Sequence, residues 1–274
     1  ALQSRIFPLF NIEFMGLMQE LQKQDIRVND PNNPGRVYFS GKALKHPLSV
    51  SDRNREFLKN LQKNSQSQVK EMCEKTDALL REINAPFTID YEDIRIKFAK
   101  NLVRERHIAR AVRESSYHHC ASEKERIDFF ERLFGGRKPN AAFNNHSDIE
   151  NEIRSVILKK GGRGFVPEDS TAFPDLQRII YFILDAEGIP CYPVLLDDSS
   201  GSMTKFEGDW DKMDEILKSY NVSCIELIPL RNSLEKLQEF VHFFQKKRYV
   251  ISFGTEHNTP GLFPITVKVE KDRD

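Results

Sequence analysis

The chain has 274 residues, enough for one large domain or for a core with an inserted subdomain. Its 41 basic and 41 acidic residues cancel, so no overall field would attract nucleic acid. It contains no apolar run of about 18 residues, which argues against a membrane-spanning helix. The N-terminus shows no secretory signal pattern, and the four cysteines form no CxxC pair. We therefore expect a cytoplasmic protein without a disulfide framework.

Two short strands are expected near the N-terminus. Residues 5–14 are rich in apolar side chains and end around Glu13, close to Gly16. A strong turn with the sequence Pro-Asn-Asn-Pro-Gly occupies residues 31–35, and residues 36–40 form the second expected strand.

Helical spacing dominates the middle of the chain. From about residue 50, apolar residues such as Phe57, Leu61 and Leu80 recur at helical intervals in a very polar background. This spacing predicts one long exposed helix or a broken pair. Because no strand pattern interrupts this stretch, an inserted helical subdomain is predicted over residues 46–160, with the core formed by residues 1–45 and 161–274. Further helices are predicted at residues 91–100, 104–114, 123–134 and 149–159.

Helices and strands alternate in the last third of the chain. A helix is predicted over residues 173–184, and repeated strand–helix units with short connections indicate parallel strands with helices outside. The fold class is therefore α/β, as a barrel or partial barrel, with a doubly wound parallel sheet as the alternative. The predicted strands are 189–196, 222–230, 249–253 and 263–269, and the helices between them are 210–220 and 234–247.

The segment after the strand at residues 249–253 is the strongest candidate for chemistry. Gly254 ends this strand, and Thr255, Glu256, His257 and Asn258 follow it. The C-terminal ends of buried parallel strands are where α/β folds place their functional side chains. Glu256 and His257 are therefore candidate metal ligands. The alternative is that these polar residues simply meet water at the end of a strand.

Five segments of the sequence carry a family resemblance. They are Asn-Ile-Glu-Phe-Met-Gly16, the helix Arg104-Glu-Arg-His-Ile-Ala-Arg-Ala-Val112, Gly162-Arg-Gly-Phe-Val-Pro167, Ile189-Pro-Cys-Tyr-Pro193 and Gly254-Thr-Glu-His-Asn258. In this order they resemble the PHP (polymerase and histidinol phosphatase) metallo-phosphoesterases, in the nucleotide-phosphatase branch that carries a helical insertion. The resemblance implies a distorted (β/α)7 barrel, incomplete at its N-terminus here, with Mn, Fe or Zn ions at the strand ends. Such ions would activate a water molecule against a phosphate ester.

The same resemblance implies Glu13 and Glu256 as ligands of a divalent metal. His257 lies at a variable position of the family motif and is a further candidate ligand, with a loop histidine hydrogen-bonded to a backbone carbonyl as the alternative. The H-x-H and D-H strands that open the family precede the Glu13 segment and do not occur in this sequence, so we expect an N-terminal segment to be missing. Three further ligand positions of the family hold Tyr38, Tyr192 and Asn258, which are poor ligands for these metals. These departures favour the alternative function, a divergent non-catalytic relative that binds an anion or a protein partner, whereas the retained carboxylates and the insertion helix favour a metal-dependent phosphoesterase.

Basic residues in three places are candidates for binding a substrate phosphate. Arg106 and His107 lie in the helix that, in the family, covers the barrel mouth. Arg163 lies in a glycine-rich basic turn, and Arg231 follows a predicted strand. In each place the alternative is a solvated basic surface. The expected ligand is a small phosphorylated molecule such as a nucleotide. A plain helical scaffold for protein contacts is a third, less favoured function.

Overall fold

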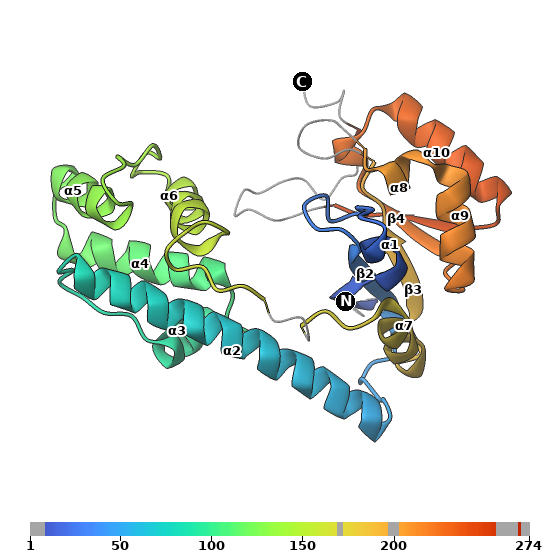
Figure 1. Ribbon diagram of the computed structural model, residues 1–274, viewed down its shortest axis with the longest axis horizontal. Coiled ribbons are helices and arrows are strands. Elements are labelled where there is room, and N and C mark those ends of the chain that lie inside the picture. Colours follow the sequence, from blue (N-terminus) through green and yellow to red (C-terminus); the bar gives the residue numbers. More distant parts are fainter. Residues whose placement is uncertain (1–8, 169–171, 197–202, 256–267, 270–274) are drawn as a thin grey trace, which may run out of the picture. The chain divides into compact units, whose positions relative to one another are not determined.

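The computed structural model describes residues 9–168, 172–196, 203–255 and 268–269 (Figure 1). The chain divides into two compact units. We call residues Ala1–Glu56 with Phe173–Asp274 the α/β unit and residues Phe57–Ala172 the helical unit. Each unit is described by itself. No helix in the described ranges is long and apolar enough to cross a membrane.

A five-stranded sheet forms the centre of the α/β unit. Its strands follow one another in space as they do in sequence, in a single open row from β1 to β5. The last three strands pair in parallel, as the repeated strand–helix units predict, whereas β1 pairs with β2, and β2 with β3, in antiparallel fashion. The sheet is therefore mixed, and the alternative prediction of a doubly wound parallel sheet is wrong. The strands are β1 (Phe10–Leu17), β2 (Arg36–Leu44), β3 (Ile189–Pro193), β4 (Cys224–Leu227) and β5 (Val250–Phe253).

Polar caps begin most helices of this unit. The side chains of Asp175, Thr204, Asp209 and Ser233 each accept a backbone N–H of the first helical turn, which satisfies donors that a helix leaves unpaired. Helix α1 was not predicted, since five residues are too few for a periodic pattern. The helices are α1 (Gln19–Lys23), α7 (Leu176–Asp185), α8 (Lys205–Gly208), α9 (Trp210–Ser219) and α10 (Leu234–Lys246).

One face of the sheet is apolar and packs against α7. Phe14 meets Phe182 edge to face, with ring centroids 5.3 Å apart. Two glycines on this face let the helix approach the strands: Gly16 lies against the side chain of Ile179, and Gly41 lies against Ile183. Because side chains alternate along a strand, this packing determines which residues face the other way.

The opposite face of the sheet carries polar side chains. Cross-strand partners share a face, so the pairing of β1 through β5 places these residues together. We call this the polar face, and its polar members are Glu13, Arg36, Tyr38, Ser40, Lys42, Cys191, Cys224, Glu226 and Ser252.

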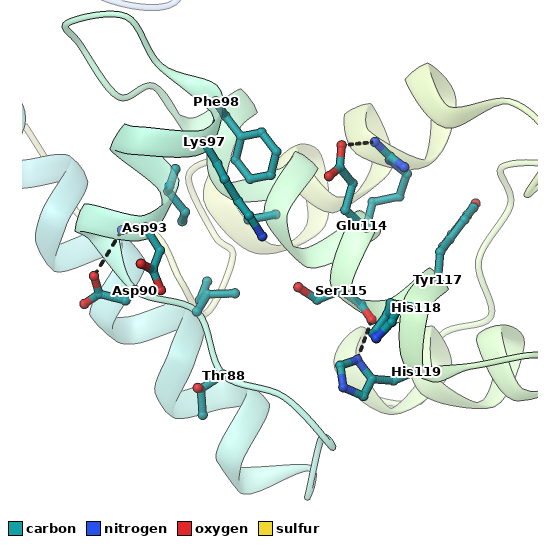
Figure 2. Close-up of a pocket in the computed structure, with 14 residues that line it drawn as sticks. Thr88, Asp90, Asp93, Lys97, Phe98, Glu114, Ser115, Tyr117, His118 and His119 are labelled. Carbon is teal, nitrogen blue, oxygen red and sulfur yellow. Dashed lines mark hydrogen bonds and ion pairs between the residues drawn. The ribbon is translucent and has the colours of Figure 1, made fainter.

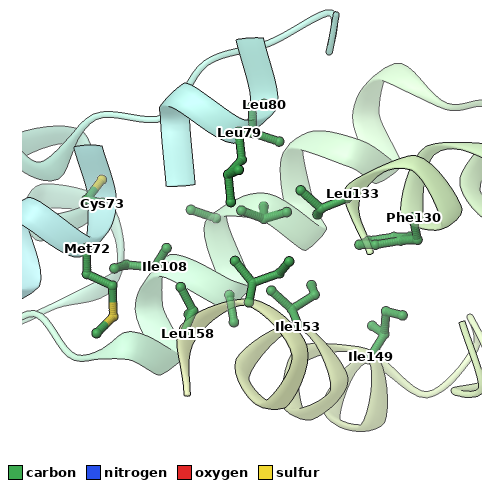
Figure 3. Packing of buried hydrophobic residues seen from close by; sticks show 14 of the residues in the cluster. Met72, Cys73, Leu79, Leu80, Ile108, Phe130, Leu133, Ile149, Ile153 and Leu158 are labelled. Atoms are coloured by element: carbon green, nitrogen blue, oxygen red, sulfur yellow. The ribbon is translucent and has the colours of Figure 1, made fainter. Parts of the chain in front are cut away.

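The helical unit is built around one apolar core (Figure 3). The long helix α2 is continuous from Asp52 to Glu82, so the prediction of one long helix is confirmed and that of two broken helices is wrong. A single π-helical turn, Arg154–Leu158, continues α6 toward the glycine-rich turn. The remaining helices are α3 (Tyr91–Phe98), α4 (Glu105–His119), α5 (Glu123–Leu133) and α6 (His146–Ile153). Core residues from these elements include Met72, Leu80, Ile108, Phe130, Leu133, Ile149, Ile153 and Leu158.

We predict that Gly41→Ala lowers the free energy of unfolding by about 1–3 kcal/mol, because overpacking a close contact costs that much. A Cβ at residue 41 would lie 2.9 Å from Ile183 Cγ1 and 3.1 Å from Ile12 Cγ2. Gly208→Ala is the matched control, since a Cβ there would meet no atom within 4 Å. Urea unfolding of both variants measures the difference. Equal stability of the two variants would show that α7 does not pack as described.

Candidate functional site

An ion pair lies on the polar face near the C-terminal end of β4. Lys42 Nζ is 2.6 Å from Glu226 Oε1, and each side chain is 20% exposed. Gly254 follows β5 and adjoins this carboxylate, because a Cβ there would stand 3.0 Å from Glu226 Oε1. The carboxyl ends of parallel strands commonly bind ligands in α/β proteins. The pair therefore marks the best-defined polar position on this face.

Two buried thiols adjoin the ion pair on the same face. Cys191 and Cys224 are directly opposite each other on β3 and β4. A hydrogen bond from the Cys191 thiol to the Cys224 sulfur lowers the pKa of Cys224, and the charge of Lys42 acts in the same direction. The same hydrogen bond, together with burial, raises the pKa of Cys191. The two residues are buried within strands, as the sequence indicated.

Glu13 lies in the middle of β1 rather than at its end. The strand runs on to Leu17 because residues 13–17 continue to pair with β2 as far as Arg36, so the expected end of this strand is wrong. Glu13 lies opposite Ser40 and is exposed. Lys42 is its diagonal neighbour on β2, a position typically about 7–8 Å away. A carboxylate at this point can take part in a ligand site on the polar face.

Tyr192 faces away from the polar face and is fully buried. Its hydroxyl donates a hydrogen bond to Glu207 Oε1 at 2.6 Å, and its ring packs against Phe206 of α8. The residue that resembles a family histidine is therefore a packed phenol. Tyr38 differs, because it lies on the polar face and remains partly exposed.

Glu207 is a buried carboxyl group that the sequence did not single out. It is inaccessible to solvent and accepts hydrogen bonds from the hydroxyls of Tyr192 and Thr204. Burial raises its pKa from 4.5 to about 7, and the hydrogen bonds only partly oppose this. Near neutral pH this carboxyl group is thus poised between its two protonation states.

In the helical unit, His107 has a structural role at the start of α4. Its Nδ1 accepts the backbone N–H of Arg104 at 3.1 Å, as the third residue of a capping box does. Burial lowers the pKa of His107, and the charges of Arg106, Arg110 and Arg104 add to the effect. The imidazole is therefore neutral at pH 7, and its other nitrogen, Nε2, carries the hydrogen. Arg106, the next residue toward the N-terminus, is exposed.

The other expected site residues belong to different units or lie outside the described residues. Arg163 pairs with Glu82 at the end of α2, with 2.5 Å between Nη2 and Oε2. Arg231 ends a short 3-10 turn directly after β4. Glu256 and His257, together with Asn258, lie outside the described residues.

A cavity of about 520 Å³ opens between α3 and the second half of α4 (Figure 2). Lys97 and Phe98 on α3 face Glu114, Ser115 and His118 on α4 across it. Its wall mixes acidic and basic groups and includes none of the expected phosphate-binding residues. The cavity therefore gives no support to the phosphate site expected from the sequence.

The described residues do not make up a metal centre. Within the ranges that the structure describes, no three His, Cys, Asp or Glu side chains are grouped so that they could hold an ion. Tyr192 cannot contribute, because its hydroxyl points into the core toward Glu207. Glu13 is the one expected ligand in these ranges, and a tetrahedral zinc site needs at least three protein ligands.

We predict that the stability of the wild-type protein falls relative to Glu207→Gln as the pH rises. The pKa of Glu207 is raised in the folded state, so folding favours the protonated form. The stabilisation from protonated Glu207 is complete below pH 4.5, the pKa of this carboxyl group in the unfolded chain. It is lost as the pH rises toward 7, the pKa in the folded protein. Between pH 5 and 8 the difference should change by roughly 2 kcal/mol.

Urea unfolding of the two proteins at several pH values measures this change. Glu239→Gln, at an exposed position of α10, is the control and should follow the wild type. Parallel pH profiles for Glu207→Gln and the wild type would contradict the ionisation of Glu207 in this range.

Comparison with solved structures identifies related folds. The structure is similar to that of a protein from Bifidobacterium adolescentis assigned as a metal-dependent phosphoesterase, with a TM-score of 0.52 and 11% sequence identity over 96% of this chain and 73% of that chain. A weaker likeness, with a TM-score of 0.48 and 12% identity over 94% of this chain and 72% of that chain, is to an amidohydrolase from Chromobacterium violaceum with bound sulfate and no metal. No protein-family model and no curated protein sequence matches the chain. The first likeness establishes that this chain has a fold similar to that of a metal-dependent phosphoesterase.

Proposed function

We propose that this chain is a PHP-like hydrolase that acts on the phosphate ester of a small molecule such as a nucleotide. The observation that carries the proposal is the polar face, where Glu13, Lys42 and Glu226 share one side of a phosphoesterase-like sheet. Residues 46–160 would then be an insertion into a barrel core formed by residues 1–45 and 161–274.

The proposed cofactor is a divalent metal, Mn, Zn or Fe. Its proposed ligands are Glu13, Glu256 and His257, which combine carboxylate oxygen with imidazole nitrogen, a donor set that these metals accept. When bound, such a metal would supply Lewis acidity and a nucleophilic water. In this proposal Lys42 would keep Glu226 neutralised, and Glu13 would supply the carboxylate ligand from the described part of the face.

The proposed phosphate-binding residues are Arg106, His107, Arg163 and Arg231. Guanidinium groups match the geometry of phosphate oxygens, so the three arginines supply charge and paired donors. His107 would contribute differently, as a neutral imidazole that donates from Nε2, since its Nδ1 accepts the N–H of Arg104. Arg163 would have to exchange its pairing with Glu82 for the substrate.

A second candidate is a divergent, non-catalytic relative that binds an anion or a protein partner at the same face. The orientation of Tyr192 favours it, because this side chain is built into the core with Glu207 and is unavailable as a ligand. The closed ion pair of Lys42 and Glu226 also favours it, since a paired carboxylate is a weaker ligand.

We predict that the purified chain hydrolyses a generic phosphomonoester, p-nitrophenyl phosphate, when Mn is added. Glu13→Gln should lower kcat/KM at least about tenfold, since even groups that only support metal ligands typically cost 10–100-fold. Glu20→Gln is the matched control, because Glu20 is an exposed residue of the same unit in a surface pair with Lys23. Release of p-nitrophenol, measured with melting temperature for each variant, gives the result.

Equal activity of Glu13→Gln and Glu20→Gln would remove Glu13 from the site. Absence of hydrolysis together with saturable binding of inorganic phosphate by calorimetry would favour the second candidate. Absence of both would contradict the hydrolase and the anion-binding form of the second candidate.

A further inference from the structure

The pair of thiols on the polar face is placed for bond formation. Cys191 and Cys224 are register partners on adjacent parallel strands. Such strands lie about 4.8 Å apart, and disulfides join Cα atoms about 4.4–6.8 Å apart. Their side chains extend from the same face of the sheet, and each thiol shifts the pKa of the other, so the two sulfur atoms are close neighbours.

The surroundings of the pair distinguish its two sulfur atoms. The contact with Cys191 and the charge of Lys42 lower the pKa of Cys224, against the opposing effects of burial and of the Glu226 charge. Lys42 is held in place by Glu226, two residues beyond Cys224 on the same face of β4. The thiolate is the form that reacts with peroxides.

The other two cysteines lack these features. Cys73 and Cys120 are buried in the helical unit, and burial raises the pKa of each thiol, for Cys73 to about 12. All four cysteines are buried, so exposure does not distinguish Cys191 and Cys224 from the other two. What distinguishes them is that they are neighbours of each other and of the Lys42 ammonium group.

We propose that Cys191 and Cys224 form a site of reversible oxidation, which a peroxide converts into a disulfide that joins β3 to β4. This inference does not depend on the proposed hydrolase activity. Oxidation would remove two thiol groups near Lys42 and link β3 to β4 beside the pair that Lys42 forms with Glu226.

The reaction balances with hydrogen peroxide as the oxidant. The Cys224 thiolate attacks one peroxide oxygen, the O–O bond breaks, and the departing hydroxide takes up a proton to become water. The resulting sulfenic acid is attacked by the Cys191 sulfur, the S–O bond breaks, and the Cys191 proton leaves with the hydroxide as a second water. Both sulfurs are oxidised, and one peroxide is reduced.

The test is hydrogen peroxide treatment of the full chain, followed by digestion without reductant and mass spectrometry of the peptides. We expect a cross-linked peptide pair that contains Cys191 and Cys224 and that disappears with dithiothreitol. The pair should lose its thiols at least roughly tenfold faster than Cys73, whose raised pKa leaves little thiolate.

Two variants separate the steps. In Cys191→Ser the sulfenic acid of Cys224 has no partner and should be trapped by dimedone, whereas Cys224→Ser should give neither adduct nor cross-link. Cys73→Ser is the control and should form the cross-link at the wild-type rate. The wild-type peptide map decides the proposal even if a variant folds poorly. Free thiols at both positions after Cys73 and Cys120 have been oxidised would overturn it.

Discussion

The α/β unit depends on the close packing of α7 against the sheet. Gly16 and Gly41 leave no side chain between helix and strands, so Ile179 and Ile183 reach the backbone itself. Side chains alternate along each strand, and a slip of one residue would exchange the two faces completely. This contact therefore determines that Phe14 and Phe39 are buried under the helix and that Glu13 and Lys42 are presented on the other side.

The two faces of the sheet carry different chemical groups. On the polar face, strands far apart in sequence bring an ammonium group, two carboxylates and two thiols to adjoining register positions. On the buried face, Tyr192 and Glu207 form a hydrogen-bonded pair inside the core. Tyr192, which resembles a family ligand, therefore lies in the core, and the charged pair of Lys42 with Glu226 lies on the polar face. The described residues do not make up a metal centre, although the fold is similar to that of a protein assigned as a metal-dependent phosphoesterase.

Local patterns in the sequence were enough for most elements of the fold. The apolar stripe of α7, the strand–helix alternation of the last third and the helical middle of the chain all followed from periodicity. Periodicity did not predict the C-terminal end of β1, because the continuation of this strand to Leu17 depends on its pairing with β2 rather than on its own residues. α1 was too short to leave a pattern.

The site was less predictable because its contacts join distant parts of the chain. Lys42 and Glu226 are 184 residues apart, and no local spacing connects them. Their shared face becomes visible only when the strand order and register are known. The cap formed by His107 could have been found, since it lies three residues after Arg104 at the start of a predicted helix. The resemblance instead implied that His107 binds a substrate phosphate.

The central claim is that the α/β unit carries a hydrolase site on its polar face, and metal content tests it most directly. Elemental analysis of the purified full chain, after dialysis against Mn or Zn, should find near-stoichiometric metal that raises the melting temperature. Glu13→Gln and Glu256→Gln should each lower that content, and Glu20→Gln should not. A chain that retains no metal at any loading, with an unchanged melting temperature, would contradict the claim and leave the polar face as a binding surface.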